Sequence, residues 1–386
     1  MNRLLRLLKR EARLFFSNKI MVVLYLGGPI LYGGMFGLVY TKGKFDNLPI
    51  VIVDQDCSPS SRQLTDMLKD SDLLHVNILK HDVYDLRRTF IADSNYAAVI
   101  IPYQFEADLL QGRQPEINVY INNTNLMPAG HTNRGLTAVL STFNAMKTAS
   151  AGKKTEAFHL NTFRLFNPSS NYFLYIWPSY LGIILQSVAM VVMALSISVE
   201  FEKRSFRRSV RAARKSIALF GLTKIVFYFL LSGISLCVYT IYFSLFRQPY
   251  PEHSLQVVLI AVPFVLTALL IGMISGLLFR SQLKSLQFLM VLSMPVFIAS
   301  GYSWPSDQSS AFAIGFANLF PYTPFVSGFR ILLTEHGSLP DIWQYILIQI
   351  MQLFIYTILA FLLLRKRIVG STYSLPKSNP YKNLLP

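Results

Sequence analysis

Residues Phe173–Val199 read FLYIWPSYLGIILQSVAMVVMALSISV, and residues Glu200–Ile217, directly after them, read EFEKRSFRRSVRAARKSI. The first stretch has no charged side chain over 27 residues, whereas the second carries seven lysines and arginines. About 20 helical residues are enough to cross the roughly 30 Å hydrocarbon layer of a bilayer. An uncharged run of this length beside a basic connection is typical of a membrane-spanning helix whose next loop is cytoplasmic.

Five further apolar runs extend this pattern over the rest of the chain. They are Ile20–Thr41, Ile217–Phe246, Leu255–Phe279, Leu286–Ser300 and Ile342–Leu364. Hydrophobic residues make up 52% of the 386 residues and charged residues only 15%, against about 25% charged in a typical globular chain. The chain has only two cysteines, so a secreted scaffold held together by disulfides is excluded. The sequence therefore predicts a polytopic α-helical membrane protein with six transmembrane helices.

Basic residues predict the orientation of these helices. Lysines and arginines gather before the first run, between the second and third, between the fourth and fifth, and after the sixth, so both termini should be cytoplasmic. The first run is too long for the apolar core of a secretory signal and is interpreted as an uncleaved anchor. The predicted parts are an amphipathic elbow helix at 1–19, a first transmembrane helix at 20–42, an outside domain at 43–170, five transmembrane helices at 171–368 and a cytoplasmic tail at 369–386.

The apolar stretch 301–333, broken by glycines and prolines, does not fit a seventh crossing. Such a crossing would place the basic residues Arg365–Arg367 outside. We expect a re-entrant hairpin here, because broken helices are tolerated at membrane depth where protein covers them. An ordinary loop with interfacial aromatic residues is the alternative.

The outside domain, 43–170, differs in net charge from the rest of the chain. It holds 12 basic and 13 acidic residues although the whole chain has a net charge of +16, so the basic excess lies beside the membrane and does not indicate nucleic-acid binding. Alternating strand and helix patterns predict a small α/β domain with a largely parallel sheet. The expected strands are Leu48–Val53, Leu74–Leu79, Tyr96–Ile101 and Ile117–Ile121, and the expected helices are Ser58–Lys69, Val83–Asp93 and Thr132–Ala149.

Ionisable residues are nearly absent from the six runs. Lys224 and Lys284 lie near predicted cytoplasmic ends, where long side chains are expected to extend toward water. Ion-driven carriers normally hold charged groups inside the membrane, so this class is disfavoured. No phosphate-binding loop, metal-ligand cluster or nucleophile motif is present in the sequence. We expect no catalytic or metal site and no cofactor in this chain, which is therefore not predicted to be an enzyme.

Two basic segments predict amphipathic helices. At helical spacing, the cations of 200–217 fall on one side, beside a narrow apolar stripe. This segment is interpreted either as a lever that docks on a soluble partner or as an anchor on anionic lipid. The N-terminal helix resembles an interfacial helix, in which Glu11 falls on the apolar side and is expected to be a stray or paired charge. Gln186, Gln349 and Gln352 are expected to hydrogen-bond between helices.

The order of these parts, with four local strings, resembles the permease subunits of bacterial ABC exporters of the second permease class (type V fold). It is most similar to the subgroup with a large extracytoplasmic domain, and the resemblance covers about residues 1–368. The strings are VDQDCSPSSRQL at Val53–Leu64, RLFNPSSNYFLYIWPSYLGIIL at Arg164–Leu185, EFEKRS at Glu200–Ser205 and NLFPYTPFVSGFR at Asn318–Arg330.

The resemblance implies a chain of the bacterial inner membrane that works with a second permease chain and an ABC ATPase subunit, on which ATP and magnesium would bind. It also implies export of a small molecule or lipid-like substrate, such as a drug or lipid, and a periplasmic adaptor with an outer-membrane channel as further partners. Coupling to the ATPase would fall on the segment 200–217, and gating on the hairpin. The coupling residues would be Glu202, Ser205, Phe206, Arg207, Val210 and Arg211, and the gating residues Gly301, Pro305, Pro321 and Pro324.

The coupling segment departs from the family pattern. Arg204 stands where glycine is usual, Ser205 where threonine is usual, and Arg207 with Arg208 where an acidic and an amide residue are expected. These changes concern the docking contacts with the ATPase and are compatible with one half of a heterodimer. The alternative function is a membrane-anchored sensor or scaffold whose outside domain binds a ligand, although one crossing would suffice for it.

Overall fold

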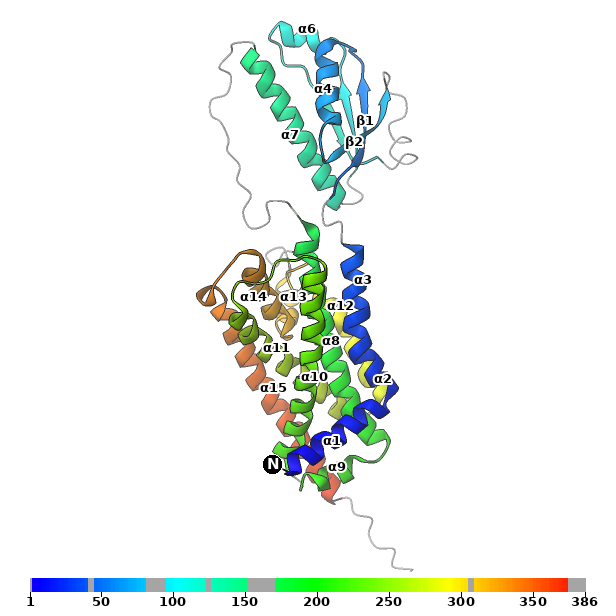
Figure 1. The fold of residues 1–386 in the computed structure, drawn as a ribbon, viewed down its shortest axis with the longest axis vertical. Coiled ribbons are helices and arrows are strands. Elements are labelled where there is room, and N and C mark those ends of the chain that lie inside the picture. The colour runs from blue at the N-terminus through cyan, green and yellow to red at the C-terminus, as the bar shows by residue number, and fades with distance from the viewer. Residues whose placement is uncertain are drawn as a thin grey trace, which may run out of the picture. The chain divides into compact units, whose positions relative to one another are not determined.

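The computed structural model describes residues 2–40, 45–80, 95–122, 126–150, 171–214, 216–304 and 309–373. The chain folds into two compact units. Met1–Gly43 and Leu165–Pro386 form a helical unit, and Lys44–Arg164 form a smaller unit that lies within the predicted range 43–170. Figure 1 shows the helices and strands of each unit.

Among the described residues, the helical unit contains six helices that are long and apolar enough to cross a membrane. The first crossing, Lys19–Val39, consists of α2 (Lys19–Val22), a π-helical turn η1 (Val23–Gly27) and α3 (Gly28–Val39). The others are α8 (Tyr172–Glu202), α10 (Ile217–Leu245), α11 (Ser254–Phe279), α12 (Gln282–Ala299) and α15 (Leu339–Tyr373). Shorter helices are α1 (Asn2–Ser17), α9 (Phe206–Ala212), α13 (Ala311–Ala317) and α14 (Tyr322–Thr334). The six predicted runs are confirmed as helices of membrane-spanning length and composition.

Helix α8 lies at the centre of the bundle and is buried along most of its length. It packs closely on α11, where glycines let the two backbones meet. A Cβ atom at Gly272 would lie 2.1 Å from the carbonyl oxygen of Met190, and one at Gly276 would lie 2.7 Å from that of Ala194. By contrast, α12 and α15 expose most of their apolar side chains, as expected of helices that face lipid.

The short helices α13 and α14 are tied to the bundle by glutamine side chains. Gln186 of α8 accepts a hydrogen bond from the backbone N–H of Tyr322 at 3.0 Å. Gln352 of α15 donates to the carbonyl oxygens of Asn318 and Phe320. Gln349 lies between the carbonyl of Ile260 and the N–H of Phe325, and its amide satisfies both when suitably oriented. The predicted use of these glutamines for hydrogen bonds between helices is confirmed.

The smaller unit is built on a four-stranded sheet with the order β2-β1-β3-β4. The strands are β1 (Leu48–Asp54), β2 (Leu74–Lys80), β3 (Ala97–Ile101) and β4 (Asn118–Ile121). Strand β1 is parallel to both β2 and β3, and β4 is antiparallel to β3. All four predicted strands are confirmed, and the sheet is parallel except at β4.

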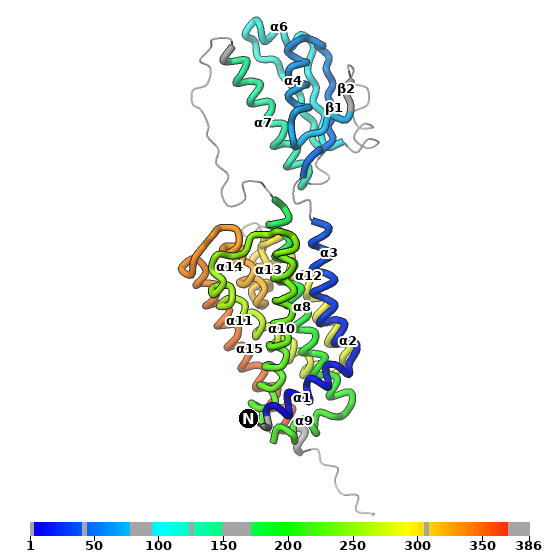
Figure 2. Tube along the Cα trace, in the orientation of Figure 1, coloured from blue at the N-terminus to red at the C-terminus, as the bar shows by residue number. Residues whose placement is uncertain are grey.

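Three described helices accompany the sheet: α4 (Pro59–Lys69), α6 (Phe105–Leu110) and α7 (Leu126–Ser150). Leucines of α4 and Phe143 of α7 share one core with Ile50, Ile52 and Val99 of the sheet, so both helices cover the same face. Figure 2 shows α4 and α7 beside the strands in a trace of the chain. Helix α6 was not predicted from the sequence, and the helix predicted at Val83–Asp93 lies outside the described residues.

Candidate coupling site

The basic segment 200–217 is divided into three parts rather than forming one helix. Helix α8 continues through Glu202, a turn follows, α9 occupies only Phe206–Ala212, and α10 begins at Ile217. The breaks fall at Arg204 and Arg214, whose backbone φ angles are 52° and 53°. A residue in this left-handed conformation ends an α-helix and is usually glycine. The predicted helix was therefore too long, because these two backbone turns were not visible in its charge pattern.

The apolar side of α9 packs into the core of the helical unit. Phe206 and Val210 are buried, with 4% and 3% exposure. The ring of Phe206 stacks on Phe201 with centroids 4.3 Å apart and meets Phe220 edge to face at 5.5 Å. These two residues, which the family resemblance assigns to coupling, therefore hold α9 in place and are not on its outer surface.

The other predicted coupling residues lie nearer the surface. Arg207 and Arg211 are exposed on α9, and Ser205, directly before the helix, is half-buried. Glu202 is also exposed, and its carboxylate accepts hydrogen bonds from the backbone N–H of Gln282, at 2.7 Å, and from the side-chain amide of the same residue. Since Gln282 begins α12, this contact places a negative charge at the positive end of that helix and joins it to the end of α8.

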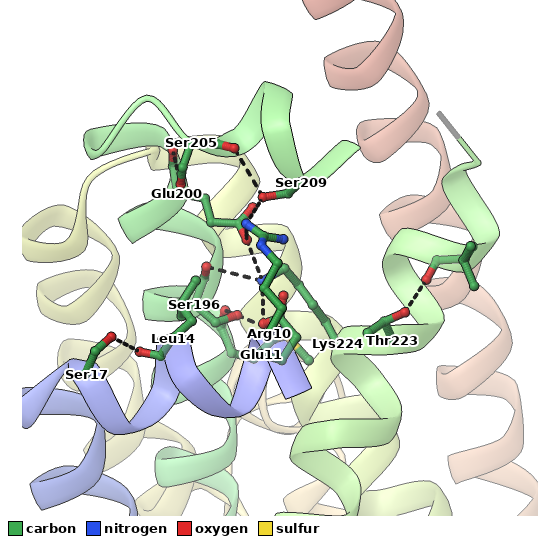
Figure 3. Close-up of polar contacts among 12 residues, drawn as sticks. Arg10, Glu11, Leu14, Ser17, Ser196, Glu200, Ser205, Ser209, Thr223 and Lys224 are labelled. Atoms are coloured by element: carbon green, nitrogen blue, oxygen red, sulfur yellow. Dashed lines mark hydrogen bonds and ion pairs between the residues drawn. The ribbon is translucent and has the colours of Figure 1, made fainter. Parts of the chain in front are cut away.

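A buried charge cluster lies beneath α9, formed by Arg10, Glu11, Glu200 and Lys224 (Figure 3). The Lys224 ammonium is fully buried, 3.0 Å from Glu11 Oε2 and 3.4 Å from Glu200 Oε1. The Arg10 guanidinium, one third exposed, lies 3.3 Å from the same Glu200 oxygen. The expectation that Lys224 extends toward water was wrong, because two carboxylates inside the protein pair with it. Glu11, expected to be a stray or a paired charge, is paired.

One carbonyl group and one hydroxyl group extend the cluster. Lys224 also donates to the carbonyl oxygen of Ser196 at 3.3 Å, and Arg10 donates to the hydroxyl of Ser209 on α9. The cluster thus connects α1 with the consecutive helices α8, α9 and α10, more than 150 positions further along the sequence. It contains two positive and two negative groups, so the buried charge is balanced. Removing one member would leave a partner charged and buried, which typically costs about 3–5 kcal/mol.

The second predicted site lies at the other end of the helical bundle, near α13 and α14 (Figure 1). Gly301 has a φ of 83°, which favours glycine. Pro321 directly precedes α14, and Pro324 is buried inside its first turn. Pro305 lies outside the described residues. The structure thus brings Gly301, Pro321 and Pro324 to one end of the bundle and the coupling residues to the other.

Close to this second site, two tyrosines join α8 to the segment that follows α12. Tyr175 and Tyr302 each donate a hydrogen bond to the other's carbonyl oxygen, and their rings stack at 4.9 Å. Within the described ranges, no group of His, Cys, Asp or Glu side chains is arranged to hold a metal ion. The contacts that the structure shows at the two sites are hydrogen bonds, ion pairs and ring packing.

Comparison with known proteins agrees with a transport role for this architecture. The chain is 23% identical over 323 residues to proteins named "Inner membrane transport permease YhhJ" from Escherichia coli (strain K12) and Shigella flexneri. These matches cover 78% of this chain and 81% of each relative. The sequence model described as "ABC-2 family transporter protein" matches residues 19–365, which include all six candidate crossings. The chain therefore belongs to the ABC-2 family of transporter membrane proteins, which implies partnership with an ABC ATPase and, with the six apolar helices, supports a multi-pass protein of the inner membrane.

Proposed function

We propose that this chain is the permease subunit of an ATP-driven exporter, which moves a small molecule or lipid-like substrate out of the cytoplasm or the inner leaflet. Membership of the ABC-2 family supports a membrane component without its own ATPase site. The observation that supports a coupling role is the position of α9. This helix exposes its charged side chains, and its inner side contacts the buried charge cluster through Ser209 and Arg10. ATP and magnesium would bind on the separate ATPase subunit.

Both chain termini and α9 are proposed to be cytoplasmic. Exposed cations on α1, α9 and the end of α15 support this orientation, because basic loops stay on the cytoplasmic side. The unit Lys44–Arg164 would then lie outside, since it follows the first crossing. This arrangement is that of the subgroup with a large extracytoplasmic domain. Helices α13 and α14, with the residues from Gly301 onward, would form the re-entrant hairpin.

The proposed mechanism begins at α9. Nucleotide-driven motion of the ATPase would displace this helix, and the ion pairs of Glu200 with Arg10 and Lys224 would carry the displacement to α1 and α10. Helix α8 would carry it along the bundle to Tyr322, which Gln186 holds. Substrate would leave beside the hairpin, where Gly301, Pro321 and Pro324 would permit gating.

Several partners complete the proposal. A second permease chain, identical or different, would form the transport pathway with this one, and two ATPase subunits would serve the pair. A periplasmic adaptor and an outer-membrane channel would accept substrate, and membrane lipid would surround the bundle. The exposed apolar side chains of α12 and α15 support contact with lipid or with the second chain. Nucleic acid is not expected to bind.

Purification of the tagged full-length chain from its native membrane tests the proposal. We expect a subunit with a phosphate-binding loop to co-purify and to hydrolyse ATP. Inverted vesicles containing the complex should accumulate a fluorescent lipophilic dye or labelled phospholipid with ATP but not with a non-hydrolysable analogue. A chain that purifies without any ATP-binding subunit, together with an outside unit that binds a ligand, would instead favour the sensor or scaffold.

A further inference from the structure

One side of α14 is polar, although the rest of this helix is apolar. The polar members, at intervals of four, three and four residues, are Thr323, Ser327, Arg330 and Thr334. This spacing places them on one side of an α-helix, and all four are half-buried. On the opposite side Tyr322, Phe325 and Leu332 are buried in the core of the helical unit. We name the four residues the polar stripe.

The three hydroxyl groups of the polar stripe donate to carbonyl groups close by in the sequence. Ser327 donates to the carbonyl oxygen of Thr323 at 3.0 Å, and Thr334 to that of Arg330 at 2.8 Å. Thr323 donates to the carbonyl oxygen of Ala317 at 2.9 Å. Each hydroxyl oxygen keeps lone pairs that can accept a further hydrogen bond. The stripe therefore presents acceptors around a single cation.

The donors of Arg330 are incompletely used. Its Nε–H is shielded from solvent but makes no hydrogen bond within the described part of the chain. Glu335 Oε1 lies 3.6 Å from this nitrogen, which forms an ion pair but is too far for a hydrogen bond. A guanidinium has five N–H donors. A buried donor without a partner usually marks the place of a water molecule, an ion or a ligand.

The surroundings of Arg330 offer it little further negative charge. Burial raises the pKa of the Tyr302 hydroxyl, and the positive charge of Arg330 opposes this, so the two side chains lie near each other. The loop residue Glu252 pairs with His336 at 3.0 Å. Among the described residues, Glu335 is therefore the carboxylate that pairs with Arg330.

The site lies at the end of the helical bundle opposite α1 and α9 (Figure 1). Trp304 and Trp343, which are 53% and 56% exposed, belong to the same end. Exposed tryptophans are typical of the depth at which lipid head groups meet the hydrocarbon layer. Phosphate groups are the common anions at that depth, and arginine binds them through two parallel N–H···O contacts.

We infer that the polar stripe binds the phosphate group of a lipid-like molecule, with Arg330 as the residue that contacts the phosphate. The inference deepens the proposed function, on which it rests for the membrane setting, because it gives a phosphate-bearing amphiphile as the class of molecule that the hairpin handles. The phosphate would take the Nε–H of Arg330 and displace Glu335 from it. Hydroxyl groups of the lipid head could donate to the serine and threonine oxygens of the stripe.

The experiment titrates the purified full-length chain, in a neutral detergent, with dioctanoyl phosphatidylglycerol and measures bound lipid by native mass spectrometry. The test variant is Arg330→Gln. The matched control is Arg247→Gln, an exposed arginine at the same end of the bundle, whose neighbour Phe246 contacts Phe173 at the start of α8. We expect the Kd to rise about tenfold in the test variant, as for loss of a hydrogen-bonded charge, and to stay unchanged in the control.

Two further variants separate phosphate binding from a structural ion pair. Glu335→Gln removes the competing carboxylate and should tighten binding by about threefold, whereas a merely structural pair would make this variant resemble Arg330→Gln. Arg330→Lys keeps the charge without the planar fork and should weaken binding by about threefold. Thermal unfolding without lipid confirms that each variant is folded.

Two other ligands identify the source of the phosphate. Dioctanoylglycerol, which lacks the phosphate, should bind the wild type at least about tenfold more weakly. Inorganic phosphate at equal concentration should not displace the lipid. Full displacement by inorganic phosphate would contradict a lipid-like ligand, and equal binding of the two lipids would contradict phosphate recognition.

Equal affinities of Arg330→Gln and Arg247→Gln would also overturn the inference. The proposed function would stand in each of these cases, because the titration contains no ATPase subunit. Absence of an ATP-binding subunit from the native-membrane preparation would instead contradict the proposed function, and the lipid titration would not detect it.

Discussion

Helices α1 and α9 are both rich in arginine and lie at the same end of the helical unit, yet they present different surfaces. Helix α1 exposes Leu5 and Phe16 beside its cations, whereas α9 exposes cations and keeps Phe206 and Val210 inside. Amino-acid composition alone does not predict which of the two helices exposes its apolar side chains, because both segments combine cations with apolar residues. The difference arises from the neighbours, because α9 lies against aromatic rings of α8 and α10 that take up its apolar side.

The buried charge cluster connects these two helices. Arg10 and Glu11 belong to α1, while Glu200 and Ser209 belong to α8 and α9, and Lys224 of α10 contacts both carboxylates. A helix that exposes large apolar side chains and a helix that buries them are thus joined by ion pairs. Four experiments test whether the surfaces of α1 and α9 differ in this way and whether the charge cluster couples the helices energetically. They are given from the largest expected effect to the smallest.

Replacing Lys224 by methionine should have the largest effect. Glu11 and Glu200 would remain buried without their shared cation, which costs about 3–5 kcal/mol in unfolding free energy. Thermal unfolding in detergent measures the loss as a lower Tm. Lys284→Met, an exposed lysine on α12, is the control and should change little. Equal Tm values for the two variants would show that the cluster does not hold α1 to α10.

Truncation of Phe206 to alanine should be nearly as damaging. The ring contacts Phe201 and Phe220 in the core, and removal of a buried phenylalanine typically costs about 3 kcal/mol or more. Arg208→Ala, on the exposed side of the same helix, should stay within about 0.5 kcal/mol of wild type. If both variants unfold alike in chemical denaturation, the two sides of α9 do not differ as described.

A double-mutant cycle should show that α1 and α10 are energetically coupled. Glu11→Gln and Lys224→Met together should cost less than the sum of the single changes, by about 1–3 kcal/mol, because each removes the other's partner. Glu11→Gln with Lys284→Met serves as the uncoupled pair, which should add within about 0.5 kcal/mol. Unfolding free energies of the six proteins provide the measurement, and additivity at Glu11 and Lys224 would contradict direct pairing.

Spin labels should distinguish the environments of the two helices with little effect on stability. Cys57 and Cys237, neither of which forms a disulfide, are first replaced by serine. A label at Phe16→Cys should collide more with oxygen, which concentrates in lipid, and a label at Ala212→Cys more with a water-soluble nickel chelate. Power-saturation spectroscopy in bilayers reports both accessibilities. The same preference at both positions would remove the distinction between α1 and α9.

Much of the fold was predictable because it depends on local pattern. Uncharged runs of about 20 residues predicted the six spans, and short apolar runs between turn residues predicted the four strands. Ser58 before Pro59 predicted the start of α4, where the serine hydroxyl accepts from the N–H of Ser61. The π-helical turn at Val23–Gly27 carries no such local signal and was not predicted.

The candidate site was predictable only in part. The basic side of 200–217 follows from spacing, but the backbone breaks at Arg204 and Arg214 do not, since arginine has no preference for left-handed geometry. The pairing of Glu11 with Lys224 spans 213 positions, which periodicity cannot reveal. The available signal was one charge within an apolar pattern in each helix, but the sequence interpretation sent Lys224 toward water and left Glu11 as a stray or paired charge, so it did not identify the pair.

The glycine contacts between α8 and α11 limit how this protein can move. With Gly272 and Gly276 against the backbone of α8, no space for a side chain remains between the two helices at these points. These two helices should behave as a rigid axis through any transport cycle. Relative motion then falls to the less buried helices around them, α10, α12 and α15, and α8 and α11 would pass on a displacement together, as one body.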